Sequence, residues 1–144
     1  MSSIYDRNSQ CSDPARFVEH AHAQPVVNYT NNKPNSWMAV DLKGARLVPD
    51  HYELRSDRNG GDKPRHWELQ ASDDGRRWAT LRSHSGDEGL SAQPMSVAHW
   101  PLDAAVVAGR AFRHFRIVQT GKNSSNDDYL CCAGIELYGL LLGA

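Results

Sequence analysis

This 144-residue sequence lacks long apolar runs, a surplus of either charge and a framework of paired cysteines. The formal net charge is −1, which gives no general electrostatic basis for binding nucleic acid. The longest apolar run near the C-terminus, residues 137–142, is too short to cross a bilayer, and the polar N-terminus has no signal-peptide core. We therefore expect no nucleic-acid partner, no membrane partner and a cytoplasmic location.

Cysteine is scarce, and Cys11, Cys131 and Cys132 cannot all pair within one chain. No C-x-x-C spacing occurs, so the cysteine pattern favours a reducing compartment. Neighbouring residues on a strand point to opposite faces, which predicts burial of one of the two adjacent thiols. Whether Cys11 pairs with Cys131 or with Cys132 stays open at this point.

The length and the composition, 40% hydrophobic and 23% charged, are those of one ordinary globular domain. We expect a flexible segment over residues 1–11 and a single domain over residues 12–144. Helix signals are rare. Asp13 before Pro14 is typical of an N-cap followed by proline at the first helical position, which predicts a short helix from Pro14 to about His20.

From Ser36 onward the apolar residues alternate with a period of two. Met38, Val40 and Leu42 share one face of the first segment. The same alternation predicts further strands at residues 52–54, 67–71, 78–81, 95–100, 112–119 and 135–137. Gly75 tolerates the positive φ of a tight turn, so residues 67–71 and 78–81 should form a hairpin.

Strands with one apolar and one polar face are typical of antiparallel sheets. No segment between them is long and helical enough to serve as the crossover of a parallel α/β fold. The pattern predicts an all-β sandwich or barrel.

Segments 35–42, 67–78 and 112–117, with 134–139 as a closing strand, resemble the galactose-binding-like, discoidin-type (coagulation-factor C-type) domain. The likeness covers about residues 12–140. Further signature residues, at 52–55, 65–67, 100–102 and 121–123, are most similar to the intracellular branch of that superfamily. This branch occurs in HECT-type ubiquitin ligases and in BTB-domain proteins.

The resemblance implies an antiparallel jelly-roll sandwich of about eight strands with ligand loops at one end. It also implies a non-catalytic binding module inside a larger protein. Sugar-binding and lipid-binding members differ in their loop residues, so no ligand class follows from the resemblance.

One candidate binding loop runs from residue 56 to residue 64, between the second and third predicted strands. Its glycine pair allows a ligand to approach the backbone, and arginine side chains match carboxylate or phosphate groups in a bidentate manner. An acidic peptide would fit this loop. The residues that we assign to it are Arg55, Arg58, Asn59, Asp62, Lys63 and Arg65.

Arg55 and Arg65, which flank this loop, have a second interpretation. Either side chain could be internal and hold the loop through a cation–π contact with Trp67, and we favour that role for at least one of them.

A second polar loop, residues 121–129, leads into the last strand. If the sandwich brings it beside residues 56–64, Lys122, Asn123 and Tyr129 would join one composite surface together with Arg113. An ordinary solvated turn is the alternative.

The four tryptophans, Trp37, Trp67, Trp78 and Trp100, are predicted to pack in the core, which leaves no platform for stacking a sugar. We predict no metal and no cofactor. His20 and His22 would lie on different faces of a helix, and Asp41, the nearest plausible calcium ligand, has few carboxylates before it.

Two sets of residues have the types that catalysis uses, and we assign neither as a catalytic site. Asp73 and Asp74 lie in a predicted tight turn, where aspartate commonly bonds to the backbone. The segment Ser83-His84-Ser85 lacks the glycines of a nucleophile elbow.

The sequence therefore predicts a non-catalytic, monomeric recognition domain of a larger intracellular protein. It would dock a protein or peptide partner through its end loops. One such role would be to recruit substrate to a ubiquitin ligase. The alternative is a carbohydrate-binding module of a secreted protein.

Overall fold

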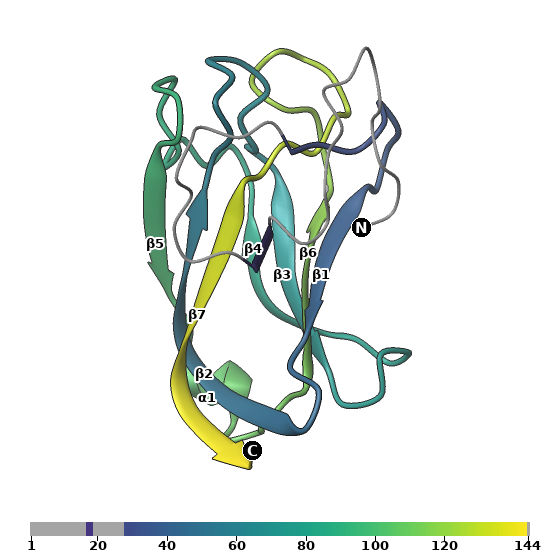
Figure 1. Cartoon of the computed structure of the whole chain (residues 1–144), viewed down its shortest axis with the longest axis vertical. Coiled ribbons are helices and arrows are strands. Elements are labelled where there is room, and N and C mark those ends of the chain that lie inside the picture. Colours follow the sequence, from purple (N-terminus) through teal and green to yellow (C-terminus); the bar gives the residue numbers. More distant parts are fainter. Residues whose placement is uncertain (1–16, 19–27, 144) are drawn as a thin grey trace.

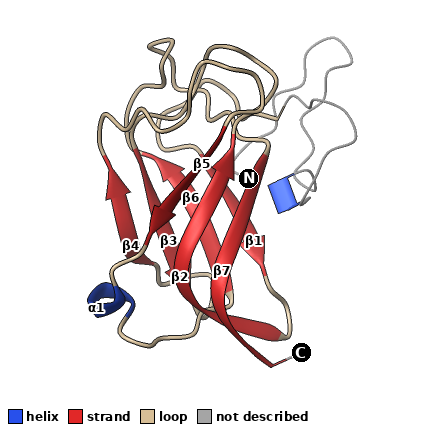
Figure 2. Ribbon diagram, turned by 90° about the vertical axis from the view of Figure 1, so that its left-hand side faces the viewer, coloured by secondary structure: helices blue, strands red, loops and turns tan. Residues whose placement is uncertain are grey.

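A computed structural model describes residues 17–18 and 28–143, and these form seven strands and one helical turn. Four strands form one antiparallel sheet in the order β1 (Trp37–Asp41), β6 (His114–Gln119), β3 (Trp67–Ser72) and β4 (Ala79–His84). Three form the other, in the order β5 (Val97–Pro101), β2 (Ala45–Arg55) and β7 (Gly134–Gly143). The two sheets face each other in Figures 1 and 2, which confirms the predicted antiparallel jelly-roll sandwich.

The inward side chains of the alternating strands fill the space between the sheets. Met38, Leu54, Leu69, Phe115 and Ile117 each have none of their surface exposed. The predicted hairpin is confirmed, because β3 pairs with β4 and Gly75 has a φ of 74° in the turn between them. Alternation along the sequence therefore predicts which faces meet in the core.

Two tryptophans depart from the prediction. Trp67 and Trp100 are buried in the core, whereas Trp37 and Trp78 are half-exposed and lie outside the core cluster. In β1 the buried residue is Met38, so its neighbour Trp37 must point to the opposite, outer face of the sheet. The prediction of core packing for all four was wrong for these two.

A chain of buried polar groups links the two sheets. The indole Nε1 of Trp67 donates to the hydroxyl of Tyr52 at 3.0 Å, and that hydroxyl in turn contacts Nε2 of His84. The other ring nitrogen of His84, Nδ1, lies 2.9 Å from a carboxylate oxygen of Asp87. Burial lowers the pKa of His84, so the ring is neutral, with Nδ1–H donating to Asp87 and Nε2 accepting from Tyr52.

The predicted N-terminal segment, residues 1–11, lies outside the described residues, as does Cys11. Of the predicted helix from Pro14 to His20, only Phe17 and Val18 are described, in a 3₁₀ turn with the Phe17 ring buried in the core. The short helix α1 (Ala104–Val107) was not predicted. Asp103 caps it by accepting a hydrogen bond from the amide of Ala105.

The strands direct the long connections to two opposite ends. At one end lie the loops after β2, β4 and β6, and at the other lie the turn between β3 and β4, helix α1 and the end of β7 (Figure 1). Near that second end Gly139 lies at a bulge in the pairing of β2 with β7. A Cβ added to Gly139 would lie 2.0 Å from the carbonyl oxygen of Val48. Only glycine fits at this close approach.

Candidate binding surface at the loop end

The two predicted binding loops lie side by side. The backbone amide of Lys63 donates to the hydroxyl of Ser124 at 2.8 Å, and the amide of Ser124 donates back to the carbonyl of Lys63 at 2.9 Å. The amide of Asp62 donates to the hydroxyl of Ser125 at 2.9 Å. We call the surface formed by residues 56–66 and 120–129 the loop end. Hydrogen bonds between residues about sixty positions apart tie its two halves together.

The second loop is held by its own side chains. The buried Asn123 accepts hydrogen bonds from the amides of Ser125 and Asp127 through Oδ1, and its Nδ2 donates to Asp62 and to the carbonyl of Tyr129. Asn123 therefore shapes the loop end and presents little of its own surface to a partner.

Lys122 and Tyr129 also make contacts within the protein. Nζ of Lys122 lies 2.6 Å from a carboxylate oxygen of Asp128, so its charge is already paired. The ring of Tyr129 stands edge-on to Tyr29, with 5.7 Å between the ring centroids. Both side chains keep some exposed surface at the rim of the loop end.

Lys63 is buried, which corrects its assignment to an exposed ligand patch. Only 1% of its surface is exposed. Its ammonium donates to the hydroxyl of Ser56 at 3.0 Å, to the carbonyl of Asn59 at 2.6 Å and to the carbonyl of Gln93 at 3.3 Å. Three acceptors satisfy its three N–H groups, so Lys63 holds the loop together from inside.

Asp57 is the second buried charged residue of this loop, and we did not include it among the candidate site residues. Its carboxylate accepts from the amide of Asn59 at 3.0 Å, with longer contacts of 3.4 Å to the side-chain nitrogen of Asn59 and to the amide of Asn28. Burial raises the pKa of Asp57 to about 6, because the hydrogen bonds and the nearby Lys63 charge offset only part of the desolvation.

The raised pKa of Asp57 predicts a pH dependence of known sign. Folded Asp57 keeps its proton up to about pH 6, whereas in the unfolded chain the aspartate loses it near its ordinary pKa of 3.8. The folded state therefore binds more protons between these values, and the contribution of Asp57 to stability falls as pH rises through this window. A carboxyl-carbon NMR titration should show a midpoint near 6 for Asp57. A midpoint at or below 4 would refute the assignment.

The two arginines that flank the first loop have different environments. Arg65 is internal: its Nη1 donates to the carbonyl of Leu90 at 2.7 Å and makes longer contacts with two other carbonyls. Nη2 of Arg55 lies 3.8 Å from Glu53, and the side chain is about one-fifth exposed. The internal role that we favoured for one of them thus applies to Arg65.

The predicted cation–π contact of Arg55 or Arg65 with Trp67 is not found among the described residues. The ring stacked on Trp67 is that of His84, with centroids 4.0 Å apart, and the guanidinium 4.0 Å above a tryptophan ring is that of Arg116 over Trp78.

Arg58 is the exposed charge of the first loop. It makes no ion pair with any residue that the structure describes. Asn59 beside it is half-exposed, with its side-chain nitrogen directed to Asp57. Half-exposed Asp62 accepts from Asn123 at 3.2 Å. Of the predicted ligand residues, Arg58 keeps the most freedom to meet a partner.

Arg113 does not belong to the loop end. It precedes β6, whereas the second loop follows β6, so the full length of that strand, about 20 Å, separates them. Arg113 instead forms a bidentate pair with Asp41, at 2.7 and 3.0 Å, which holds the pKa of that carboxyl well below its usual range. The predicted strand limits already contained this information, because Arg113 lies at the start of the predicted strand 112–119 and Lys122 follows its end.

Among residues 17–18 and 28–143, no group of three or more histidine, cysteine, aspartate or glutamate side chains could hold a metal ion. His20 and His22 lie outside that range. Cys131 and Cys132 are both buried as free thiols, one more than predicted, and burial raises the pKa of Cys132 to about 12. No helix among the described residues is long and apolar enough to span a bilayer.

The sandwich has the same fold as several carbohydrate-binding modules. It superposes with a TM-score of 0.68 on the family 32 carbohydrate-binding module of Streptococcus pneumoniae EndoD, at 8% identity over 96% of this chain and 95% of that one. The score is 0.66 for a module, CBM32-1, of a family 31 glycoside hydrolase from Clostridium perfringens, at 16% identity over 96% and 89% of the two chains. Identities this low show the fold alone.

Sequence similarity points to a different group of proteins. The chain is 39% identical over 117 residues to the E3 ubiquitin-protein ligase Ufd4 of Drosophila melanogaster, and 41% identical over 117 residues to the E3 ubiquitin-protein ligase hecd-1 of Caenorhabditis elegans. Each match covers 80% of this chain and 4% of the relative's length. No protein-family model matches the sequence.

Proposed function

We propose that this domain is a non-catalytic recognition module of an intracellular ubiquitin ligase, and that it docks a protein segment through the loop end. The observation that carries the proposal is the mutual tethering of residues 56–66 and 120–129. Loops held in one arrangement before binding lose little conformational entropy when a partner arrives. The similarity to segments of two E3 ubiquitin-protein ligases supports the ligase context.

The non-catalytic part of the proposal rests on how the candidate catalytic groups are used. Both ring nitrogens of the buried His84 are engaged, by Tyr52 and by Asp87. Oδ1 of Asp74 contacts the hydroxyl of Ser72 and accepts from the amides of Arg76 and Arg77, so it shapes the turn. Neither group presents a free base or acid to a substrate.

A protein partner fits the loop end better than a sugar does. A partner interface of standard size buries about 800 Å² on each side, which the loop end and its surroundings can offer. A sugar would be expected to stack on an exposed aromatic ring. None of the four tryptophans lies in residues 56–66 or 120–129, and the ring of Tyr129 already packs edge-on to Tyr29. The carbohydrate-binding alternative therefore rests on the fold of the structural neighbours.

The role of Arg58 gives a direct test. Peptides selected for binding to the purified chain should bind the Arg58→Glu variant at least tenfold more weakly, because the substitution reverses the exposed charge of the first loop. The melting temperature should stay within a few degrees, since exposed substitutions usually cost under about 0.5 kcal/mol. Isothermal titration calorimetry measures the affinity.

The matched control is Arg76→Glu, which reverses an exposed arginine at the opposite end of the sandwich. It should leave the affinity for the selected peptides within twofold. Equal binding by wild type and Arg58→Glu would exclude the loop end as the docking surface. Specific binding in a glycan screen, with no peptide selected, would favour the carbohydrate alternative.

A further inference from the structure

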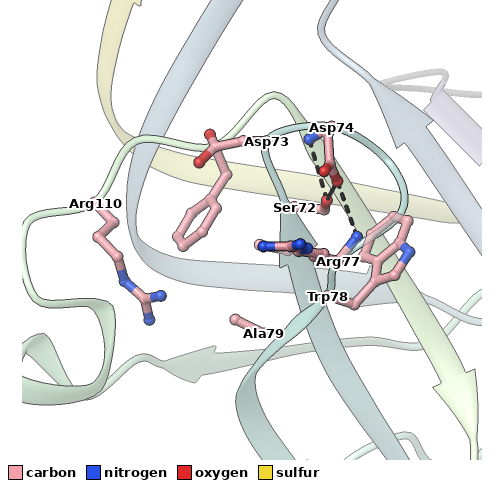
Figure 3. A pocket seen from close by; sticks show the side chains of 9 residues that line it. Ser72, Asp73, Asp74, Arg77, Trp78, Ala79 and Arg110 are labelled. Atoms are coloured by element: carbon pink, nitrogen blue, oxygen red, sulfur yellow. Dashed lines mark hydrogen bonds between the residues drawn. The ribbon is translucent and has the colours of Figure 1, made fainter.

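A pocket of about 280 Å³ lies at the end of the sandwich opposite the loop end. It is formed by the turn between β3 and β4 together with the segment that follows α1 (Figure 3). Ala71, Trp78, Ala79 and Phe112 provide its apolar lining. None of the candidate residues that the sequence analysis assigned to a ligand lines this pocket.

The two carboxylates at the rim of the pocket are already engaged. Oδ1 of Asp74 accepts hydrogen bonds from the amides of Arg76 and Arg77 at 2.8 and 2.9 Å, and these bonds lower its pKa to about 2. Oδ1 of Asp73 forms an ion pair with Nη1 of Arg46 at 2.9 Å. Neither carboxylate lies within ion-pair distance of the guanidinium groups of Arg77 and Arg110, the two arginines that line the pocket.

Two arginines enter the pocket with charges that no described carboxylate neutralises. The guanidinium of Arg77 lies in the middle of the view in Figure 3, and that of Arg110 approaches from the other side. Arg110 is held in place because its Nε and Nη2 donate to the carbonyls of Val107 and Val106 at 3.2 and 3.1 Å. It also lies over the ring of Phe112, with 5.2 Å to the centroid. Carbonyl groups orient the guanidinium and leave its charge uncompensated.

The charges around the pocket favour a singly charged anion. The charged lining residues are Arg77, Arg110, Asp73 and Asp74. Asp73 is already paired with Arg46 from outside the lining, so Asp74 is the one remaining carboxylate for the two guanidinium groups. A carboxylate carries one negative charge and accepts hydrogen bonds from an arginine fork. A phosphate group carries close to two negative charges and would meet repulsion from both aspartates.

We propose that this pocket binds a glutamate or aspartate side chain of an acidic protein segment, with a neighbouring apolar side chain of that segment resting on the apolar lining. Arg77 and Arg110 would hold the carboxylate from two sides. The site is separate from the loop end, so it stands or falls independently of the docking function proposed there.

The probe is an N-acetylated, C-amidated peptide of alternating glutamate and leucine, titrated into ¹⁵N-labelled protein. Amide shifts should change at residues 72–78 and 110–112. The same peptide with glutamine in place of glutamate should bind at least tenfold more weakly. The Arg77→Gln, Arg110→Gln double variant should lose at least tenfold in affinity for the glutamate peptide.

Arg76→Gln is the matched control, because Arg76 belongs to the same turn and does not line the pocket. It should change the affinity less than twofold. Arg110 also binds the carbonyls of α1, so Arg77→Gln alone is measured too and should weaken binding at least threefold with an unchanged melting temperature.

Several results would overturn the proposal: no shift changes at millimolar peptide, equal binding by wild type and the Arg77→Gln variant, or shift changes confined to residues 56–66. The last result would instead support docking at the loop end. A phosphoserine peptide that binds more than tenfold more tightly than the glutamate peptide would refute the assignment to a carboxylate.

Discussion

Replacing Trp67 with alanine is expected to lower the free energy of unfolding by about 3–5 kcal/mol. The ring has no exposed surface, stacks on His84 and meets Trp100 edge-on with 5.2 Å between centroids. Its Nε1 also donates to Tyr52, so the substitution opens a cavity and removes a hydrogen bond that joins the two sheets. Because β3 leads out of the loop end at Trp67, loss of this anchor should loosen the loops as well.

Trp78→Ala is the matched control for this measurement. Trp78 is half-exposed in the turn between β3 and β4, so removing its ring should cost about 1–2 kcal/mol. Urea unfolding followed by far-ultraviolet circular dichroism gives both values. Equal losses for the two variants would mean that Trp67 is not the anchor that its burial indicates.

Replacing Lys63 with methionine is expected to lower the free energy of unfolding by about 3 kcal/mol, although the two side chains have similar volumes. The substitution removes the donor for Ser56 and Asn59, in the loop after β2, and for Gln93, in the loop after β4. It also removes the positive charge that lowers the pKa of the buried Asp57. The variant should therefore raise the pKa of Asp57 further, in the carboxyl-carbon titration described above.

Arg58→Met is the control for Lys63→Met, because it removes an exposed positive charge from the same loop. Its effect should stay within about 0.5 kcal/mol. If urea unfolds Lys63→Met and wild type at the same midpoint, the buried ammonium does not hold the first loop together from inside.

The strands and the core could be predicted because their signal is local. The side chains of a strand alternate at every residue, so Met38, Leu69 and Ile117 identify the buried face without knowledge of their partners. The same rule places Trp37 outside, and the prediction of core packing for every tryptophan wrongly ignored it. That prediction relied on the size and apolarity of the tryptophan side chain and not on its position in the alternation of the strand.

The interior of the loops could not be predicted in the same way. Lys63 and Arg58 lie five residues apart in one polar, glycine-containing segment, yet one is buried and the other exposed. The difference depends on a carbonyl of Gln93, thirty residues away, and on the hydroxyl of Ser124, sixty-one residues away. Composition cannot reveal such contacts, because they exist only after the sandwich has formed.

The pocket near Trp78 is a further feature that could not be predicted from the sequence. Arg77 and Arg110 are thirty-three positions apart in the sequence, and no motif connects them. The topology brings them together, because the turn between β3 and β4 lies at the same end of the sandwich as the segment that follows α1.

The most direct test of the central claim is an amide chemical-shift map of the chain with a selected peptide bound. Docking at the loop end predicts that the shifts change at residues 56–66 and 120–129 while the outer face of the four-stranded sheet stays unchanged. Changes centred on that outer face, with residues 56–66 and 120–129 unaffected, would contradict the claim.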